Sequence, residues 1–555
     1  MINRLTIDAF TICRVVYSVI FVFLRVVVLS SLFLYNRRKQ TRKLQPRLLF
    51  TNSVFIPIYY FNECKKLMAT MMDGMKENIP KNIPKNIPKK TNLITIPHIT
   101  NIPEKTNQEA LPRLDIKPIK NWSLFKWSIV AVVSGIFGFR FYQQLFVMDP
   151  IAGIYSSLVA FLILTSLLFT LIRYKDPASL YSRNNGPIKN THQKVSIIIP
   201  ARNEPKIIRN TVRACLASSY SNIEIILVND GSSDETGDVM DLLHKENPGQ
   251  VKVIHLSKNM GKRGAIREAM LHAKIEGNII MLHDSDSVVE KTAIEKIMNV
   301  FNDPDVGAVS CHARPLNAGN NILTKMQDTW YNGSYYIMKG MESSFGSVTC
   351  CTGVLSAYRK EAIMPCLEAW ANDKFMGVEF RPGDDRHLTS YLIGGSKHYL
   401  GKQNRVWKTY YCESAVVFTE VPSNFKTFIN QQIRWKKSWI RVFLFTAPFY
   451  FKNRSPIAAS FYYIQMLLSI IAPVIAIRNL VLLPLMGNYP SAIAYILGVL
   501  SIGLLYAMVF KARNPGSGNR WVYRLLISLL SLFLLSPLLY YALLKIKEGK
   551  AWNTR

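Results

Sequence analysis

The stretch I-E-I-I-L-V-N-D-G-S-S-D, residues 223–234, decides the fold class because an apolar run passes directly into an acidic turn. A short apolar run bounded by turn residues is typical of a strand buried on both faces of a parallel sheet. Similar runs occupy residues 195–200, 251–256 and 278–283, and helical patterns alternate with them. The sequence therefore predicts an open, mostly parallel α/β sheet, in which ligands bind at the carboxyl ends of strands.

Two carboxylates follow the run 278–283, in the sequence Asp284-Ser285-Asp286. Acidic side chains one residue apart can hold a hard divalent cation that also binds a diphosphate. A solvated turn is the alternative interpretation. At the end of a strand, we expect Asp284 and Asp286 to bind a metal.

Polar groups at neighbouring positions predict a nucleotide site. Asp230, at the end of its strand, could accept hydrogen bonds from a uracil or a ribose, and Glu204 in P-A-R-N-E could act similarly. Lys262 and Arg263, in N-M-G-K-R-G-A, begin a helix after a glycine. Two cations at a helix N-terminus favour phosphate binding, whereas an exposed basic turn is the alternative.

The motif G-D-D-R, residues 383–386, follows Pro382 and presents two adjacent carboxylates after a turn. Neighbouring like charges raise the proton affinity of one member, which suits a general base. We therefore expect Asp384 and Asp385 to be catalytic, with Asp385 as the base.

The motif Q-Q-I-R-W, residues 431–435, places Gln431, Arg434 and Trp435 on one face of a helix. An amide, a fixed positive charge and an indole fit a sugar that stacks beside an anionic leaving group. A salt-bridged surface helix is the alternative. Together, the motifs predict displacement at the anomeric carbon of a nucleotide diphosphate sugar. A single displacement with one base inverts the anomeric configuration.

The composition favours a membrane protein over a nucleic-acid binder. The 555 residues include 68 Lys and Arg against 36 Asp and Glu, a net charge of +32, and 49% are hydrophobic. Long apolar runs joined by basic cytoplasmic loops explain both features. The eight cysteines lack metal-site spacing, so we expect reduced thiols in a cytosolic domain.

Five parts are expected along the chain. They are an N-terminal hydrophobic helix with a basic flank (1–48), a disordered basic linker with a K-N-I-P repeat (49–122), a transmembrane hairpin (123–175), a cytosolic catalytic domain (190–440), and interface helices with transmembrane segments (441–555).

Two apolar segments have uncertain topology from sequence. Residues 8–35 fit either a transmembrane helix or an amphipathic surface helix. Residues 521–545 contain Ser536-Pro537, and we expect this segment to lie in the interface or to bend back. We therefore expect a multi-pass plasma-membrane protein whose basic C-terminal tail and catalytic domain both lie in the cytoplasm.

The order of these motifs resembles the processive, membrane-embedded family-two inverting glycosyltransferases. C-T-G-V-L-S-A-Y-R at 351–359 and W-N-T-R at 552–555 resemble hyaluronan synthases, and chitin and poly-N-acetylglucosamine synthases share most of the pattern. The resemblance covers residues 123–555. It implies a GT-A domain on a transmembrane channel, Mg²⁺ or Mn²⁺, UDP-sugar donors, a growing polysaccharide acceptor and contact with membrane lipid, with no nucleic acid.

The same resemblance implies residue roles. Trp435 would stack on the acceptor sugar, Asp286 would be the principal metal ligand, and Asp284 would face the nucleotide. Trp552 and Arg555 would lie over the nucleotide site.

Departures from the family pattern leave the product open. Gly353-Val354 replaces a Gly-Pro in the acceptor loop, and Asn553 replaces a glycine. A GlcNAc-type polymer and one that alternates with glucuronate, as in hyaluronan, both fit. The alternative function is a non-processive transferase that loads a sugar onto a polyprenyl phosphate or another lipid.

Overall fold

The computed structural model describes residues 128, 131, 132, 135, 138, 149–184, 193–375, 377–399 and 405–547, all within one compact unit. The expectations for residues 1–122, for most of the first arm of the hairpin, and for Trp552 and Arg555 concern positions outside this described part.

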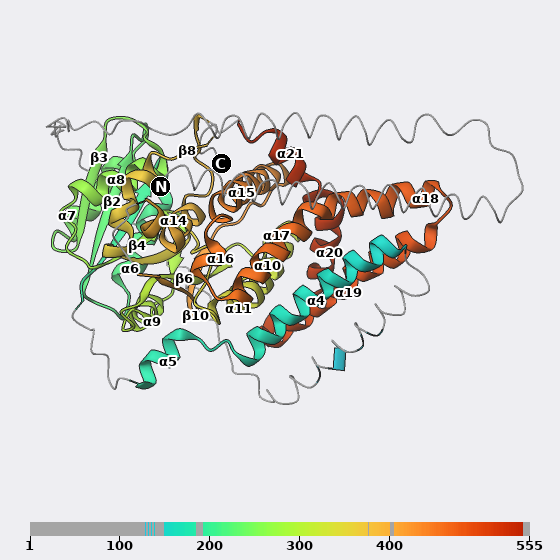
Figure 1. Ribbon diagram of the computed structural model, residues 1–555. Coiled ribbons are helices and arrows are strands. Elements are labelled where there is room, and N and C mark those ends of the chain that lie inside the picture. The colour runs from blue at the N-terminus through green and yellow to red at the C-terminus, as the bar shows by residue number, and fades with distance from the viewer. Residues whose placement is uncertain are drawn as a thin grey trace, which may run out of the picture. The chain divides into compact units, whose positions relative to one another are not determined.

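A mostly parallel eight-stranded sheet forms the centre of the catalytic region, which confirms the predicted fold class (Figure 1). In spatial order its strands are β3 (Val251–Leu256), β2 (Ile223–Asp230), β1 (Val195–Ala201), β4 (Ile279–His283), β7 (Leu355–Arg359), β6 (Val306–Pro315), β10 (Lys408–Thr419) and β5 (Ser287–Val289). Strands β7 and β5 run antiparallel to their neighbours. A separate pair joins β8 (Lys374–Phe375) to β9 (Val378–Glu379).

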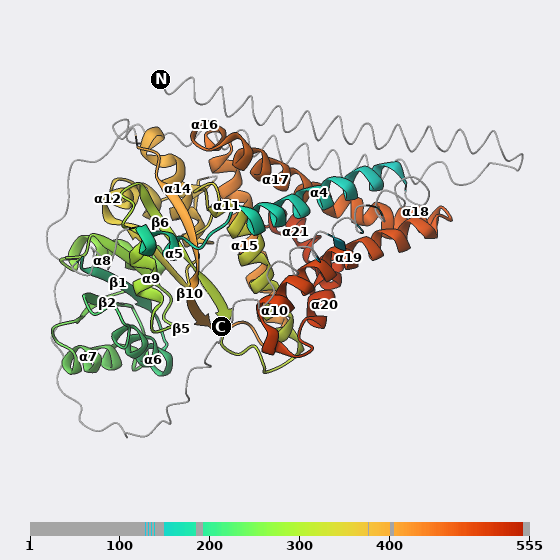
Figure 2. The same ribbon diagram turned by 90° about the horizontal axis from the view of Figure 1, so that it is seen from below.

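Helices cover both faces of the sheet, which explains why its central strands are apolar throughout (Figure 2). Side chains alternate between faces along a strand. Accordingly, Ile197 and Ile199 of β1 belong to one buried cluster and Ile198 to the other. The first face packs against α6 (Pro205–Leu216), α7 (Thr236–Glu246) and α9 (Ala293–Val300). The second packs against α8 (Gly261–His272), α12 (Lys360–Ile363), η2 (Met364–Cys366), α13 (Leu367–Ala371) and α14 (Asp384–Tyr399).

The remaining elements form a helical region beside the sheet, except for α5 (Pro177–Asn184), which packs against α9 and β10. They are α4 (Pro150–Ile172), α5, α10 (Ile322–Gly333), η1 (Ser334–Lys339), α11 (Gly340–Ser343), α15 (Phe425–Thr446), α16 (Tyr450–Asn453), α17 (Pro456–Ile477), η3 (Arg478–Leu482), α18 (Leu483–Leu485), α19 (Tyr489–Arg513), η4 (Pro515–Ser517), α20 (Val522–Leu530), η5 (Ser531–Leu535) and α21 (Leu538–Leu544).

Four helical segments of the described part are long and apolar enough to cross a membrane, judged by length and composition: Pro150–Leu180, Pro456–Leu485, Tyr489–Arg513 and Val522–Leu544. The last is interrupted by the wide turns of η5 and by Pro537, and its halves α20 and α21 pack against α10 and α15. That this segment bends back instead of crossing stays a prediction.

Helices α10 and α15 join the two regions. Helix α10 contacts both β6 and α20, and α15 contacts both α14 and α21. Asn424 caps α15 by accepting a hydrogen bond of 2.8 Å from the backbone N–H of Thr427. This single helix of 22 residues runs across the expected boundary at residue 440. The Gln-Arg-Trp motif therefore lies on a helix that touches both the α14 helix and the apolar segments.

Candidate active site

Asp230 lies at the carboxyl end of β2 and is fully buried. Its Oδ1 accepts a hydrogen bond of 2.6 Å from the backbone N–H of Met260, while Oδ2 has no partner among the described residues. Burial raises the pKa of Asp230, although Arg202 and Arg381 act in the opposite direction. A buried acceptor with spare capacity fits the hydrogen-bond donors of a nucleoside.

Glu204 connects the first strand-end loop to the acidic D-S-D turn. It is the N-cap residue of α6, and its carboxylate accepts a hydrogen bond from the hydroxyl of Ser285. Thr211 of α6 donates to the carbonyl of Ser285 at 2.7 Å. These bonds fix the turn between Asp284 and Asp286, so Glu204 holds the turn as well as standing near the expected nucleotide site.

Asp284 forms an ion pair with Lys262 of α8 beside the backbone of Gly353. Burial alone would lower the pKa of Lys262, but Asp284 and the further charges of Asp384 and Asp385 raise it above its ordinary value. A Cβ atom on Gly353 would stand 3.2 Å from the Lys262 Nζ and 3.4 Å from the Asp284 Oδ2. The absence of a side chain at Gly353 therefore lets a lysine and a carboxylate approach its backbone closely.

Asp385, in the first turn of α14, reaches the same glycine from the other side. The backbone N–H of Gly353 donates to Asp385 Oδ2 at 2.9 Å, and the Cys350 thiol lies 3.8 Å from that oxygen. Gly383 starts this turn with φ +71°, a conformation that favours glycine. Lys262, Asp284 and Asp385 thus converge on Gly353 although they come from three different elements.

Asp384 and Arg263 pair with each other, whereas their sequence neighbours Asp385 and Lys262 lie at Gly353. The Arg263 Nε donates to Asp384 Oδ1 at 2.5 Å, and both side chains are largely buried. Trp370 donates to the Asp384 carbonyl at 3.1 Å, and the Arg263 guanidinium lies 5.8 Å from its ring centre. The Arg263 Nη2 is buried without a partner among the described residues, but the ion pair itself gives these two side chains an anchoring position between α8 and α14.

The Gln-Arg-Trp face of α15 borders a group of aromatic side chains. The ring of Trp435 lies 6.2 Å from Trp330 and 6.1 Å from Tyr331, both on α10. Burial raises the pKa of Tyr331, and Arg434 lowers it to a smaller extent. Trp435 therefore stands in a cluster of aromatic rings from α10.

Two buried polar atoms on this face lack a hydrogen-bond partner among the described residues. Gln431 Oε1 and Arg434 Nε are buried, and neither is hydrogen-bonded within the part of the chain that the structure describes. Buried polar atoms normally have partners. A hydroxyl-rich ligand against Trp435 would supply them.

Sequence reasoning missed Tyr331, and it placed Arg441 differently. An aromatic dipeptide near the end of an amphipathic helix is common in cores, so Trp330-Tyr331 gave no signal of its own. Residues 436–451 resemble an amphipathic helix at the membrane interface, but Lys437 and Arg441 are buried in the structure. Arg441 instead pairs with Asp373, 68 positions away.

The acidic pair fits a divalent cation with an incomplete protein ligand set. Asp284 and Asp286 offer hard carboxylate oxygens, and no group of three or more His, Cys, Asp or Glu in the described residues forms a site by itself. Such a site suits a cation whose other ligands come from a diphosphate and water. The space left by Gly353 beside Asp284 is compatible with that arrangement.

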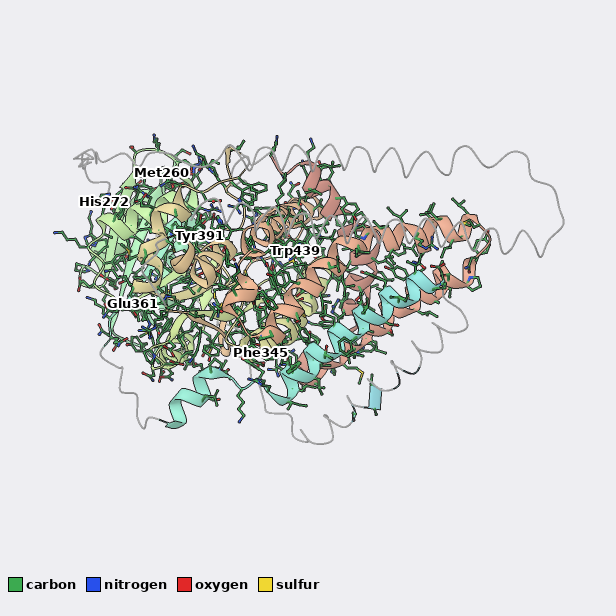
Figure 3. All side chains as sticks on the ribbon, viewed as in Figure 1. Met260, His272, Phe345, Glu361, Tyr391 and Trp439 are labelled. Atoms are coloured by element: carbon green, nitrogen blue, oxygen red, sulfur yellow. The ribbon has the colours of Figure 1, made fainter. Side chains whose placement is uncertain are left out.

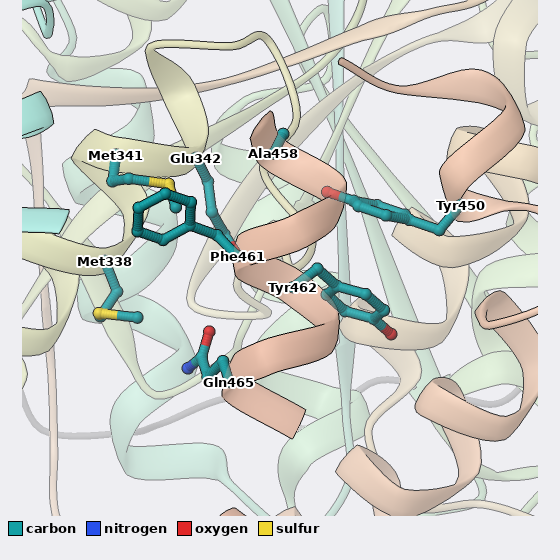
Figure 4. A pocket seen from close by; sticks show the side chains of 8 residues that line it. All are labelled: Met338, Met341, Glu342, Tyr450, Ala458, Phe461, Tyr462 and Gln465. Carbon is teal, nitrogen blue, oxygen red and sulfur yellow. The ribbon is translucent and has the colours of Figure 1, made fainter. Parts of the chain in front are cut away.

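A small cavity lies where α17 meets α11, and it shares no lining residue with the strand-end group (Figure 4). It is lined by Met338, Met341, Glu342, Tyr450, Ala458, Phe461, Tyr462 and Gln465. Glu342 accepts a hydrogen bond of 2.7 Å from the Thr349 hydroxyl, and burial raises its pKa. The cavity belongs to the packing between the apolar helices and the sheet region.

Parts of the chain are similar to known proteins. Residues 192–438 match the model of the "Glycosyltransferase like family 2". A hyaluronan synthase of Streptococcus pyogenes is 30% identical over 375 residues, which cover 66% of this chain and 84% of that protein. An N-acetylglucosaminyltransferase of Azorhizobium caulinodans is 28% identical over 367 residues, or 65% of this chain and 87% of that protein. A mannosyltransferase from Pyrobaculum calidifontis, solved in complex with GDP-Man and Mn²⁺, shares 17% identity with a TM-score of 0.46, over 72% of this chain and 99% of that chain.

The mostly parallel sheet, with its acidic strand ends and adjoining apolar helices, therefore defines a membrane glycosyltransferase of the GT-A type. The chain belongs to glycosyltransferase family 2.

Proposed function

We propose that this protein is a processive polysaccharide synthase that transfers sugar from a UDP-sugar to a growing chain, with inversion, and secretes the product. The observation that carries the proposal is the meeting of Lys262, Asp284 and Asp385 around Gly353. The relatives named hyaluronan synthase and N-acetylglucosaminyltransferase support a GlcNAc-type donor, used alone or alternating with glucuronate.

On this proposal the donor binds across the strand ends. Asp230 and Glu204 accept hydrogen bonds from the nucleoside, and Lys262 neutralises the diphosphate. Asp284 and Asp286 would hold Mg²⁺ or Mn²⁺, which when bound neutralises charge on the leaving group. Trp552 and Arg555 remain proposed contacts of the nucleotide and lie outside the described residues.

The acceptor approaches along α15. Its terminal sugar stacks on Trp435, while Gln431 contacts its hydroxyl groups and Arg434 faces the leaving diphosphate. The Gly353 N–H fixes Asp385 Oδ2, so that the carboxylate is oriented to take the proton of the attacking hydroxyl. Attack on the face opposite the diphosphate inverts the anomeric carbon.

In this scheme Asp384 and Arg263 do not touch substrate. Their ion pair instead fixes the start of α14 against α8. The proposed location is the plasma membrane, with the catalytic domain in the cytoplasm where nucleotide sugars are made and the product leaving through the apolar helices.

The proposal is tested with the purified full-length protein in lipid nanodiscs. UDP-GlcNAc and UDP-glucuronate are supplied singly and together, with Mg²⁺ or Mn²⁺, and UDP release is recorded. We expect UDP to be released from UDP-GlcNAc, either when it is the single donor or only when UDP-glucuronate is also present. Absence of UDP release with every UDP-hexose tested would refute the proposed donor class.

A further inference from the structure

Helix α14 carries the proposed base on one face and a buried polar cluster on another. Asp384, His387 and Tyr391 are spaced at i, i+3 and i+7, so they share a face, whereas Asp385 points towards Gly353. Figure 3 labels Tyr391 on α14 and Trp439 on α15. On this face the rings of His387 and Tyr391 lie 5.5 and 4.7 Å from the ring of Phe445 on α15, whereas Asp384 at its start pairs with Arg263 of α8.

Asp373 links these two helices. Arg441 of α15 donates through Nη2 to both Asp373 oxygens, at 2.8 and 3.1 Å, and the Tyr391 hydroxyl donates to Asp373 Oδ1 at 3.2 Å. The side chains of Asp373 and Arg441 are 7% and 9% exposed. A buried ion pair at this spacing fixes two elements relative to each other, because separating the charges leaves each of them uncompensated.

The surroundings of Arg441 restrict its movement. Its guanidinium lies between the rings of Phe375 and Phe445, at 5.0 and 5.1 Å from their centres. His387, 1% exposed, stands 3.5 Å from Asp373, and burial lowers its pKa well below 6.5, with Arg263 and Arg441 adding to the effect. The histidine is therefore neutral. Burial raises the pKa of Asp373, and Arg441 is the strongest influence in the opposite direction, so the carboxylate and the guanidinium depend on each other.

The pair also lies between the two halves of the proposed site. Arg441 follows Trp435 by less than two helical turns on α15, while the ion pair of Arg263 with Asp384 ties the N-terminal end of α14 to α8, which carries Lys262. The ion pair of Arg263 with Asp384 thus joins α8 to α14. Asp373, in the loop between α13 and β8, joins α14 to α15 by accepting from Tyr391 and pairing with Arg441.

We propose that Asp373 and Arg441 are positioning residues that hold the acceptor helix α15 in register with the base on α14. This inference rests on the proposed glycosyl transfer. Neither residue touches substrate, so their loss should separate donor breakdown from sugar transfer. Water still hydrolyses the UDP-sugar and UDP is released, but fewer donor molecules transfer their sugar to the acceptor.

The test uses the double variant Asp373→Asn/Arg441→Met in the full-length protein. It removes both charges together, because a single substitution would leave one buried charge unpaired and could prevent folding. The matched control is Asp149→Asn/Arg478→Met, since that pair is equally buried, at 5% and 9% exposure, with an N–O distance of 2.8 Å, and lies among the apolar helices. Tyr391→Phe is a milder second variant that removes one hydrogen bond to Asp373.

The readout is the ratio of sugar transferred to UDP released, together with the affinity for UDP. We expect the ratio to fall about tenfold in the double variant, because displacement of reacting groups by about 1 Å can cost up to a hundredfold in rate. The fall should be smaller in Tyr391→Phe and absent in the control, with UDP affinity within twofold throughout. Arg441→Lys, which keeps the charge, should recover part of the ratio.

An unchanged ratio in the folded double variant, or an equal fall in the control, would overturn the positioning role while leaving the proposed function intact. Wild-type protein that releases no UDP from any UDP-sugar would instead refute the proposed function, and the positioning role with it.

Discussion

At the residue scale, Asp385 is held by one hydrogen bond from the backbone of Gly353. Asp385→Asn keeps an oxygen for this bond but cannot accept a proton. We expect kcat for UDP release in the presence of acceptor to fall by about 10² to 10⁴, the usual contribution of a general base, with UDP affinity nearly unchanged. Glu368→Gln is the control, because Glu368 is an exposed acid of α13 paired with Arg267. Equal activities of Asp385→Asn and wild type would remove Asp385 from the base role.

His312 of β6 predicts a pH dependence of stability. Burial lowers its pKa well below 6.5, and Arg314 and Arg513 lower it further, so the folded state holds it neutral. The unfolded chain binds a proton at this position below about pH 6.5, and the free energy of unfolding therefore falls as the pH falls through that value.

His312→Asn should flatten this dependence, since an amide can still meet the Tyr411 hydroxyl, which lies 2.6 Å from His312 Nδ1, but does not titrate. The measurement is the thermal unfolding midpoint of the wild type and of His312→Asn between pH 5 and pH 8, and the midpoint of the variant should fall less towards pH 5. Parallel curves would contradict the assignment.

Residues at strand ends were predictable, and residues that pair across the chain were not. Asp230, Asp284 and Asp286 each follow an apolar run, so their position at the carboxyl edge followed from the sheet alone. The partners of Arg263 and Arg441 lie 121 and 68 positions away, and arginine and aspartate are common residue types without local pattern. Only the folded chain distinguishes Asp384, which is paired, from Asp385, which faces Gly353.

At the scale of elements, the turn before α14 depends on Gly383. Its φ is +71°, and a Cβ atom there would overlap the side chain of Ser438 on α15. Gly383→Ala should therefore displace α14 from α15, and lower both stability and transfer. Gly377→Ala is the matched control, because Gly377 has φ +80° with no atom near its Cβ position, so only backbone strain of about 1–2 kcal/mol applies.

Adding Ser438→Gly to Gly383→Ala should relieve the overlap and leave the strain. Compared with the single variant Ser438→Gly, which carries the cost of about 0.5–1 kcal/mol for a glycine within α15, the double variant should then lose only as much stability as Gly377→Ala does. If Gly383→Ala lost no more stability than Gly377→Ala, the contact between this turn and α15 would not restrict the site.

Element boundaries were less accessible from sequence than element type. The strand at 223–230 was expected at its observed bounds, since an apolar run ends abruptly at Asn229-Asp230. Helix α15 continues past residue 440, where Arg441 pairs with Asp373 and Phe445 packs against His387 and Tyr391 of α14. That this part of the chain also lies at the membrane interface stays a prediction. Hydrophobic and amphipathic patterns do not reveal whether the covering partner is lipid or protein.

At the scale of the whole molecule, the proposed orientation places the α19–α20 loop in the cytoplasm. This loop follows α19 and contains Arg520. The loop that precedes α19 contains Met486, which is 57% exposed. If Tyr489–Arg513 crosses the membrane, the two ends lie on opposite sides. On intact cells an impermeant maleimide should label Met486→Cys, whereas Gly516→Cys should react only after the cells are opened.

The unsubstituted protein is the control for this labelling, and its six cysteines in the described part are all buried. A cysteine at Gly516 is sterically tolerated because no atom lies within 4 Å of its Cβ position. Labelling of both variants on intact cells would contradict the proposed orientation.

The size of the product tests the central claim most directly. Purified protein in nanodiscs is incubated with radiolabelled UDP-GlcNAc, with and without UDP-glucuronate, and the products are separated by size after lipid extraction. We predict a polysaccharide of high molecular mass that remains in the aqueous phase and is shortened by a glycosidase of matching specificity. A product confined to a single sugar on an extractable lipid would contradict the account.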